Sequence, residues 1–259
     1  MSLLKVTNLG KSFGGVKAVD GISFELAAGE LLALIGPNGA GKSTTFNMVN
    51  GQLLADVGSI TLDGQELLGM APREIWRLGV SRTFQIAETF LSLTVVENVQ
   101  MALLSRDKKL YSFLTRAAHH KRDEALNLLD QVSMKAQADR PCSVLAYGDV
   151  KRVELAIAMA NSPKLLLMDE PTAGMAPKER NDLMALTKQL VTDRGMAVLF
   201  TEHSMDVVFA YADRMIVLAR GRLIAGGKPL EIRDDPKVQE VYFGTGKTFE
   251  KAQTQKEPA

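Results

Sequence analysis

The sequence has a single cysteine and almost no net charge, and each scarcity excludes a class of protein. Cys142 cannot form a disulfide within the chain, and nothing near it has the spacing of a metal-binding motif, so we expect a plain thiol there. Lysine and arginine number 31 against 30 acidic residues, which leaves a net charge of +1. A chain this close to neutral has no overall basic field to attract DNA or RNA. Nucleic acid is therefore not expected as a partner.

Long apolar runs are also missing. No stretch approaches the roughly 18 apolar residues that a membrane span requires. Residues 1–6 lack the charged segment and apolar core of a secretion signal, so we expect the chain to stay in the cytosol. With 259 residues, of which 46% are hydrophobic and 24% charged, the chain can form one large or two modest cores and is too apolar for general disorder.

Residues 36–43, reading Gly-Pro-Asn-Gly-Ala-Gly-Lys-Ser, fit the P-loop (Walker A) pattern at every required position. The apolar run before them predicts a buried strand over residues 31–35, and a helix is predicted after Lys42, which is the context that the motif needs. The glycines of such a loop let backbone N–H groups face phosphates, and the helix N-terminus adds its positive end. Lys42 would reach the β- and γ-phosphates and Ser43 would ligate Mg²⁺, whereas an accidental glycine-rich turn is the alternative. The predicted nucleotide-binding residues of this loop are Gly36, Pro37, Asn38, Gly39, Ala40, Gly41, Lys42, Ser43 and Thr44.

Two kinds of apolar pattern predict two sheets. Alternating apolar and polar residues at 22–26 and 58–62, the second followed by an Asp63-Gly64 turn, predict a small antiparallel sheet. Later apolar runs are separated by segments with helical spacing, and they span residues 165–168, 197–201 and 215–218. This alternation predicts a parallel sheet covered by helices, and so an α/β fold.

The middle of the chain has a different pattern. Between residues 87 and about 160 no comparable strand is predicted, and apolar residues fall at helical spacing. We therefore predict a helical subdomain, at about 87–160, inserted into a single domain that spans residues 1–246. Residues 247–259 are mostly polar and are predicted to be disordered. The charged cluster at 119–124 is predicted to be a solvated helical face, because its adjacent histidines would point to different sides of a helix.

The apolar run that begins at residue 165 ends in two carboxylates, Asp169 and Glu170. P-loop enzymes use such a strand end as their second metal-binding element. Asp169 would hold Mg²⁺ through water, and Glu170 would be the general base that polarises the attacking water. An acidic pair at a strand end is usually a solvated loop, but its occurrence beside a P-loop favours the catalytic interpretation.

Two further polar residues follow predicted strands. His203 lies just past the strand that ends at Thr201, where strand ends of an open α/β sheet meet their ligand. It would hydrogen-bond the γ-phosphate, and the alternative is an ordinary histidine at a helix start. Gln85 follows the strand-like residues 80–84, and its amide would face both the metal and the water.

Residues 145–149, reading Leu-Ala-Tyr-Gly-Asp, precede a helix predicted over residues 150–160. The order and spacing of this segment, the P-loop, Gln85, the acidic pair and His203 resemble the ATP-binding cassette (ABC) ATPases over about residues 3–245. The resemblance implies an α/β P-loop NTPase fold with a parallel core sheet, an N-terminal antiparallel β subdomain and an inserted helical subdomain. It implies that Phe13 stacks on adenine, the alternative being core packing. It also implies a signature, acting on the ATP of a partner subunit, made of Leu145, Ala146, Tyr147, Gly148 and Asp149.

Three segments narrow the resemblance to the ATP-binding subunits of branched-chain amino acid importers: Phe-Gly-Gly-Val-Lys-Ala-Val at 13–19, Ser-Arg-Thr-Phe-Gln at 81–85 and Tyr-Phe-Gly at 242–244. This similarity implies an ATPase, with ATP and Mg²⁺ as cofactors, that energises import of branched-chain or other hydrophobic amino acids or related small organic anions. Its implied partners are integral membrane permease subunits, a second ATPase subunit that is identical or related, and a periplasmic substrate-binding protein. The implied location is the cytoplasmic face of the bacterial inner membrane. Residues 86–99 would contact the permease, the alternative being simple packing of Leu91, Val95 and Val96.

In the family that the chain resembles, each ATP lies between the P-loop of one subunit and the signature of the other, so a lone chain should hydrolyse ATP poorly. ATP would close a head-to-tail pair, and hydrolysis would let the pair part and move the membrane subunits. The chain departs from the general pattern at four positions, one of which is Ile157, where an arginine is common. Ala146 lacks the usual serine hydroxyl, which leaves the γ-phosphate contact to backbone N–H groups such as that of Gly148. Asp149 replaces a glutamine near a helix start, and Ala176 removes one polar contact across the dimer.

Two other functions compete with this one. A soluble ABC ATPase acting on nucleic acid or the ribosome would normally bring two cassettes in one chain, a long heptad insertion or zinc-type cysteines, and the sequence has none of them. A P-loop kinase acting on a small acceptor has no place for the signature or for His203. The sequence therefore favours the importer ATPase.

Overall fold

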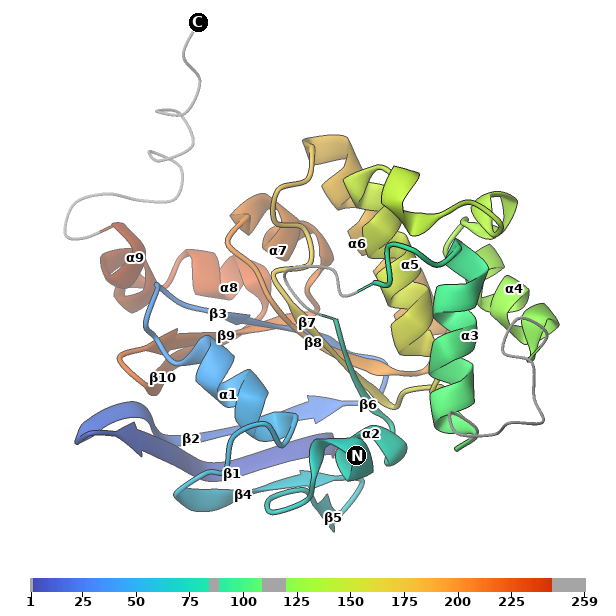
Figure 1. Cartoon of the computed structure of the whole chain (residues 1–259). Coiled ribbons are helices and arrows are strands. Elements are labelled where there is room, and N and C mark those ends of the chain that lie inside the picture. Colours follow the sequence, from blue (N-terminus) through green and yellow to red (C-terminus); the bar gives the residue numbers. More distant parts are fainter. Residues whose placement is uncertain (1, 84–88, 109–119, 244–259) are drawn as a thin grey trace, which may run out of the picture.

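The computed structural model describes residues 2–83, 89–108 and 120–243, and two sheets dominate it (Figure 1). The strands of the larger sheet are β3 (Leu31–Ile35), β6 (Val80–Thr83), β7 (Leu165–Asp169), β8 (Ala197–Thr201), β9 (Arg214–Ala219) and β10 (Arg222–Gly227). Their order across the sheet is β10-β9-β3-β8-β7-β6. All neighbouring pairs are parallel except β10 and β9 at one edge. The predicted parallel core sheet is confirmed, and because β3 is central in it, the P-loop starts from the middle of the sheet.

The smaller sheet is antiparallel and formed by the N-terminal part of the chain. Its strands are β1 (Ser2–Phe13), β2 (Val16–Ala27), β4 (Val57–Leu62) and β5 (Gln65–Glu66), in the order β2-β1-β4-β5. The turn between β4 and β5 has positive φ at both Asp63 (+52°) and Gly64 (+80°), as a tight hairpin with right-handed twist requires. The predicted antiparallel sheet is confirmed.

The helices surround the larger sheet (Figure 1). They are α1 (Lys42–Val49), α2 (Pro72–Arg77), α3 (Val95–Arg106), α4 (Arg122–Gln131), α5 (Tyr147–Met159), α6 (Pro177–Arg194), α7 (Met205–Tyr211), α8 (Pro229–Arg233) and α9 (Pro236–Phe243). Short 3-10 turns lie at Lys135–Gln137 and Cys142–Val144. Among the described residues, no helix is long and apolar enough to cross a membrane.

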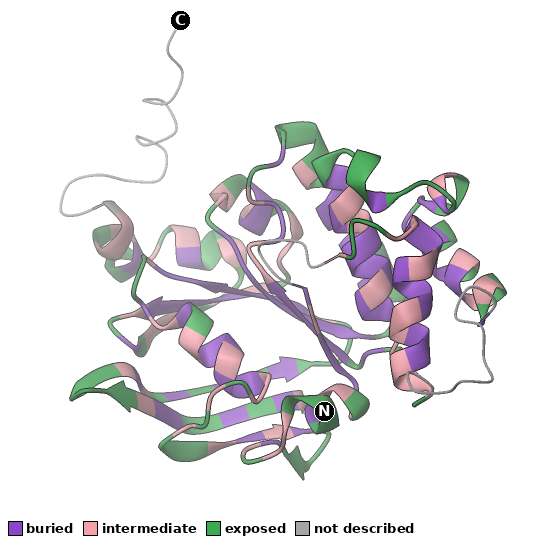
Figure 2. Cartoon of the chain, in the orientation of Figure 1, coloured by how far each residue is buried: buried purple, intermediate pink, exposed green. Residues whose placement is uncertain are grey.

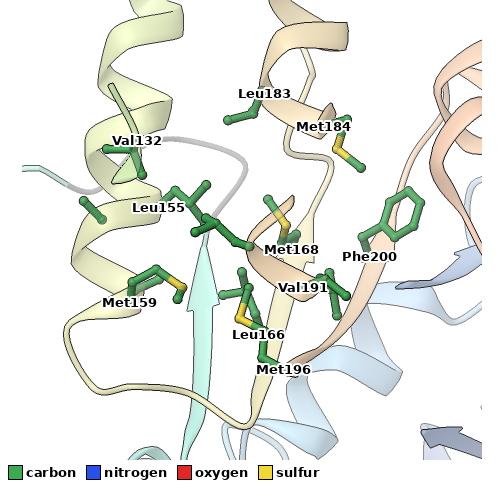
Figure 3. Packing of buried hydrophobic residues seen from close by; sticks show 14 of the residues in the cluster. Val132, Leu155, Met159, Leu166, Met168, Leu183, Met184, Val191, Met196 and Phe200 are labelled. Carbon is green, nitrogen blue, oxygen red and sulfur yellow. The ribbon is translucent and has the colours of Figure 1, made fainter. Parts of the chain in front are cut away.

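Successive residues of the central strands point to two different cores. Leu32 and Leu34 of β3 pack with α1 and the antiparallel sheet, whereas Ala33 and Ile35 pack with the helices on the opposite face. In Figure 3, Leu166 and Met168 of β7 lie on that opposite face among side chains of α5 and α6. Both faces of the central strands are therefore buried, as Figure 2 shows, and this explains why β3, β7 and β8 are apolar runs.

The described chain between β6 and β7 forms helices and turns, apart from one β-bridge between Thr94 and Pro141. Helix α3 begins at a capping box, because the Thr94 hydroxyl accepts from the Glu97 amide and the Glu97 carboxylate accepts from the Thr94 amide (2.8 Å). Asn98 of α3 donates to the sulfur of Cys142, which is buried. The predicted helical subdomain is confirmed, while its boundaries at about 87 and 160 and the single-domain span 1–246 remain predictions.

One local prediction is wrong and a second is wrong in part. The helix expected over residues 150–160 begins at Tyr147 and ends at Met159, so the last three signature residues lie in its first turn. The cluster predicted as a solvated helical face is one only in its later part, where Lys121 and Asp123 are exposed and α4 begins at Arg122. His120 departs from the prediction, because it precedes α4 and is buried, with its Nε2 3.1 Å from Asp107 Oδ2. The predictions for Gln85, His119 and the tail 247–259 fall outside the described residues.

Candidate nucleotide-binding site

The P-loop connects β3 to α1 through two glycines that have no room for a side chain. A Cβ on Gly36 would lie 2.2 Å from the carbonyl oxygen of Leu218, and one on Gly41 would lie 2.4 Å from that of Ala18. Gly41 also has φ +106°, a conformation that other residues rarely adopt. The loop is thus pressed against β9 and β2, and α1 starts at Lys42 in a fixed position.

Lys42 is almost completely buried, with 8% of its surface exposed. Its ammonium group donates to the carbonyl oxygens of Gly36 (2.7 Å) and Pro37 (3.2 Å). Burial lowers the pKa of Lys42, and the carboxylates of Glu170 and Asp169 partly offset this by raising it. The loop therefore contains a desolvated cation with two acidic side chains nearby.

A cavity of about 310 Å³ opens over the loop. The lining residues are Phe13, Ala18, Asn38, Gly39, Ala40, Gly41, Lys42, Ser43, Thr44 and Glu170. Phe13, at the end of β1, is 50% exposed, which excludes the alternative of core packing. The cavity is lined by an aromatic residue, Phe13, by the P-loop and by the acidic residue Glu170, which come from three separate parts of the chain.

The acidic pair lies at the carboxyl end of β7 and is held by the neighbouring strands. Asp169 accepts hydrogen bonds from the Thr201 hydroxyl at Oδ1 (2.8 Å) and from Arg82 Nη2 at Oδ2 (3.0 Å). The Glu170 amide donates to the Thr201 carbonyl (3.2 Å) and hydroxyl (3.0 Å) oxygens. These bonds hold Glu170 at φ +49°, an uncommon conformation for a residue with a side chain.

His203 meets Glu170 at this edge of the sheet. Its Nε2 lies 2.7 Å from Glu170 Oε1, and half of its side chain is exposed. His203 also lies just before α7, so the alternative prediction of a histidine at a helix start is met as well. The structure thus brings together the loop after β7 and the loop after β8, although their residues are 33 positions apart.

The predicted signature lies at the start of α5. Ala146 is the N-cap and has no side-chain oxygen to cap the helix, Tyr147 is 44% exposed, and Gly148 is buried. Asp149 lies in the first turn, where the helix dipole favours a carboxylate, and accepts from Gln137 Nε2 (3.2 Å). Leu145 packs against the helical side of the core. None of these five described residues lines the P-loop cavity.

Comparison with known proteins decides the family. A family model described as ABC transporter matches residues 19–173, more than half of the chain. The chain belongs to the ABC transporter family. A second model, described as branched-chain amino acid ATP-binding cassette transporter, matches residues 222–248. Members of this family bind ATP and hydrolyse it to power transport, so the predicted cofactor ATP and the predicted ATPase activity are confirmed at the level of the family.

Relatives of this ABC ATPase match it along most of its length. The high-affinity branched-chain amino acid transport ATP-binding protein LivG of Escherichia coli K12 is 39% identical over 93% of this chain and 98% of its own. The corresponding BraF protein of Pseudomonas aeruginosa is 38% identical over the same shares. The structure of the ADP conformation of MJ1267, an ATP-binding cassette of an ABC transporter, has a TM-score of 0.84 and 32% identity over 94% of this chain and 99% of its own. The dimeric post-hydrolysis structure of the cassette MJ0796, bound to ADP and Pi, has a TM-score of 0.74 and 25% identity over 87% and 98%. These matches confirm the predicted ABC fold and the resemblance to the branched-chain amino acid subunits.

Sequence reasoning missed two polar residues of this ABC ATPase. Arg82 donates to Asp169 and also to Asn47 Oδ1 (2.7 Å) and Gln52 Oε1 (3.0 Å), so it joins the P-loop helix to the acidic pair. Glu202, next to His203, is buried with 4% of its surface exposed. The sequence does place both charged residues within or directly after an apolar strand. A charged side chain that is buried there needs a partner, and this could have marked both residues as part of a site.

Proposed function

We propose that this chain is the ATP-hydrolysing subunit of an ABC importer for branched-chain or other hydrophobic amino acids, or for related small organic anions. The observation that carries the proposal is the separation of the P-loop cavity from the signature, residues 145–149, within the described chain. A second cassette is needed to bring a signature to this P-loop. The substrate class is supported by relatives named as branched-chain amino acid transport proteins.

ATP would bind with its adenine on Phe13 and its phosphates on the amides of the P-loop and the N-terminus of α1. The exposed ring of Phe13 and the cavity beside it support this orientation. Lys42 would exchange the carbonyls of Gly36 and Pro37 for the β- and γ-phosphates. This exchange is favourable because a buried ammonium gains an anionic partner in place of two neutral ones.

The residues beside the phosphates suit Mg²⁺. The Ser43 hydroxyl and the Asp169 carboxylate are the hard oxygen ligands that this ion prefers, and Gln85, outside the described residues, would add an amide oxygen. Asp169 accepts bonds from Arg82 and Thr201, which fix the orientation of its carboxylate. Bound Mg²⁺ would neutralise charge that develops on the phosphates during hydrolysis.

Glu170 would accept a proton from the attacking water as general base. The 2.7 Å contact with His203 would orient its carboxylate toward the cavity, and His203 would also hydrogen-bond the γ-phosphate. Closure of the pair by ATP and its opening after hydrolysis would drive the membrane subunits. The related cassette MJ0796, which forms a dimer, supports this pairing.

The partners would be integral membrane permease subunits, a second identical or related ATPase and a periplasmic substrate-binding protein, at the cytoplasmic face of the inner membrane. An exposed apolar patch supports a permease contact within residues 86–99. Phe90 and Leu91 are each 58% exposed, whereas Val95 and Val96 are buried and only pack. Val144 extends the patch, since the amide of Ser143 next to it bonds to the Leu91 carbonyl (3.2 Å).

Two variants test the proposed chemistry. Glu170→Gln should keep ATP affinity but lower turnover by roughly 10²–10⁴-fold, because the amide cannot accept the proton. Lys42→Ala should weaken ATP binding by about 100-fold, because the phosphates lose a buried cation. Normal turnover in the first variant would exclude Glu170 as the base, and unchanged affinity in the second would exclude the P-loop assignment. Uptake of radiolabelled leucine by vesicles that contain the whole transporter tests the branched-chain assignment, and ATP-independent or absent uptake would contradict that assignment.

A further inference from the structure

Glu202 is a buried carboxylate directly behind the hydrolysis site. It follows the last residue of β8, and its two oxygens accept four hydrogen bonds. Oε1 accepts from the amide (2.9 Å) and the hydroxyl of Thr172, and Oε2 accepts from the amides of His203 (3.0 Å) and Ser204 (3.3 Å). One side chain therefore joins the segment after Glu170 to the segment that carries His203.

These four hydrogen bonds are stronger than bonds between neutral groups. A buried carboxylate that accepts from several N–H and O–H groups makes charge-assisted bonds, and each donor would be left unsatisfied without it. Thr172 is two residues after Glu170, and His203 is adjacent to Glu202. The Glu202 carboxylate thus fixes the backbone on both sides of the 2.7 Å contact between Glu170 and His203.

We propose that Glu202 is a positioning residue that couples Thr172 to the backbone of His203 and so keeps His203 aligned with Glu170. This inference rests on the proposed function, in which Glu170 is the general base and His203 orients its carboxylate. Without the Glu202 carboxylate the two segments lose their shared partner, so the contact between His203 and Glu170 is no longer held in place.

Glu202→Gln tests the coupling. The amide oxygen can still accept two of the four hydrogen bonds, but the amide NH₂ group cannot accept the other two and places its own donors against them. We expect turnover to fall by about tenfold or more, with ATP affinity within about twofold of the wild type, since Glu202 does not line the P-loop cavity. Glu231→Gln is the matched control, because this exposed acid also accepts a hydrogen bond from a backbone amide, that of Lys228 (2.9 Å), at a helix start. The control should leave both quantities unchanged.

A second readout separates positioning from a general structural role. The chain has three histidines, so the imidazole proton signals of His203 can be followed by NMR. In Glu202→Gln they should move toward their positions in Glu170→Ala, where the contact cannot form, while those of His120 stay. Wild-type turnover, or a fall in turnover with an unmoved His203 signal, would overturn the coupling.

If Glu202→Gln does not fold, Thr172→Val removes one of the four bonds, and it should shift the same signal and lower turnover by a smaller factor. An unmoved signal and normal turnover in that variant would equally overturn the coupling. Measuring Glu170→Gln in the same assay distinguishes failure of the coupling from failure of the proposed hydrolysis site. If it is inactive while Glu202→Gln is normal, only the coupling fails, and if it is active, the proposed hydrolysis site fails.

Discussion

Replacing Gly41 by alanine should disable the nucleotide site without removing any side chain from it. The new Cβ would lie 2.4 Å from the Ala18 carbonyl oxygen, whereas ordinary contacts begin at 3.4 Å, so the loop would have to shift by about 1 Å (3.4 − 2.4). Gly41 is the N-cap of α1, so the shift would carry the first amides of the helix with it. If two of their bonds to phosphate are lost at about 1.5–3 kcal/mol each, ATP binds about 3–6 kcal/mol more weakly, or roughly 10²–10⁴-fold.

The assay is equilibrium binding of a fluorescent ATP analogue, with Gly29→Ala as the matched control. Gly29 also has positive φ (+73°), but no atom lies within 4 Å of a Cβ placed there. Gly29→Ala should lose about 1–2 kcal/mol of unfolding free energy from the strained backbone, measured with urea, and Gly41→Ala should lose more, because its Cβ also clashes with Ala18. Only Gly41→Ala should lose ATP affinity. Affinity within about threefold of the wild type in Gly41→Ala would refute the argument that the close approach to Ala18 positions the loop.

Two further variants probe the adenine contact and a distant charge cluster. Phe13→Ala should weaken ATP binding about fivefold, which is equivalent to about 1 kcal/mol of stacking. It should leave the unfolding free energy of the nucleotide-free protein unchanged, because the ring is half exposed. Unchanged affinity in the same binding assay would contradict the stacking. Burial alone would raise the pKa of Asp107, but hydrogen bonds from Lys121, Arg106 and His120 lower it to about 2. A folded-state pKa below the unfolded value of about 3.9 stabilises the protein above that pH and ceases to do so as the pH falls toward 2. Asp107→Asn should therefore lower the unfolding free energy by about 1–2 kcal/mol at pH 7 and by progressively less between pH 5 and 2, and a pH-independent loss would argue against the ion pairs.

The central strands were predictable because burial on both faces leaves an unbroken apolar run. The runs predicted at 31–35 and 197–201 coincide with β3 and β8. The start of α5 was not predictable in the same way. Ala146 carries no capping oxygen and Gly148 is a weak helix former, so local propensity placed the start three residues too late.

The P-loop and the acidic pair were predictable because each is local in sequence. The contacts that hold the site are not local: Arg82 and Asp169 are 87 positions apart, and Thr172 and Glu202 are 30 apart. They meet because β6 lies beside β7 and β7 beside β8, an order that the sequence pattern does not specify. The burial of His120 was missed for the same reason, since its partner Asp107 belongs to another helix end.

Steady-state ATP turnover in a mixture of two inactive variants tests the composite site most directly. Lys42→Ala disables the P-loop, and Gly148→Asp places a carboxylate in the signature at a position where a Cβ already lies 3.4 Å from the Glu179 side chain. Each variant should be nearly inactive alone, and a cooperative melting transition shows that each is still folded; that of Gly148→Asp should be lower than that of the wild type, because the new carboxylate lies beside Glu179. Random pairing makes about half of the dimers mixed, each with one intact site, so the mixture should regain about a quarter of wild-type turnover. Wild-type turnover of Gly148→Asp alone, or a mixture no more active than its separate components, would contradict a site shared between two copies of this chain.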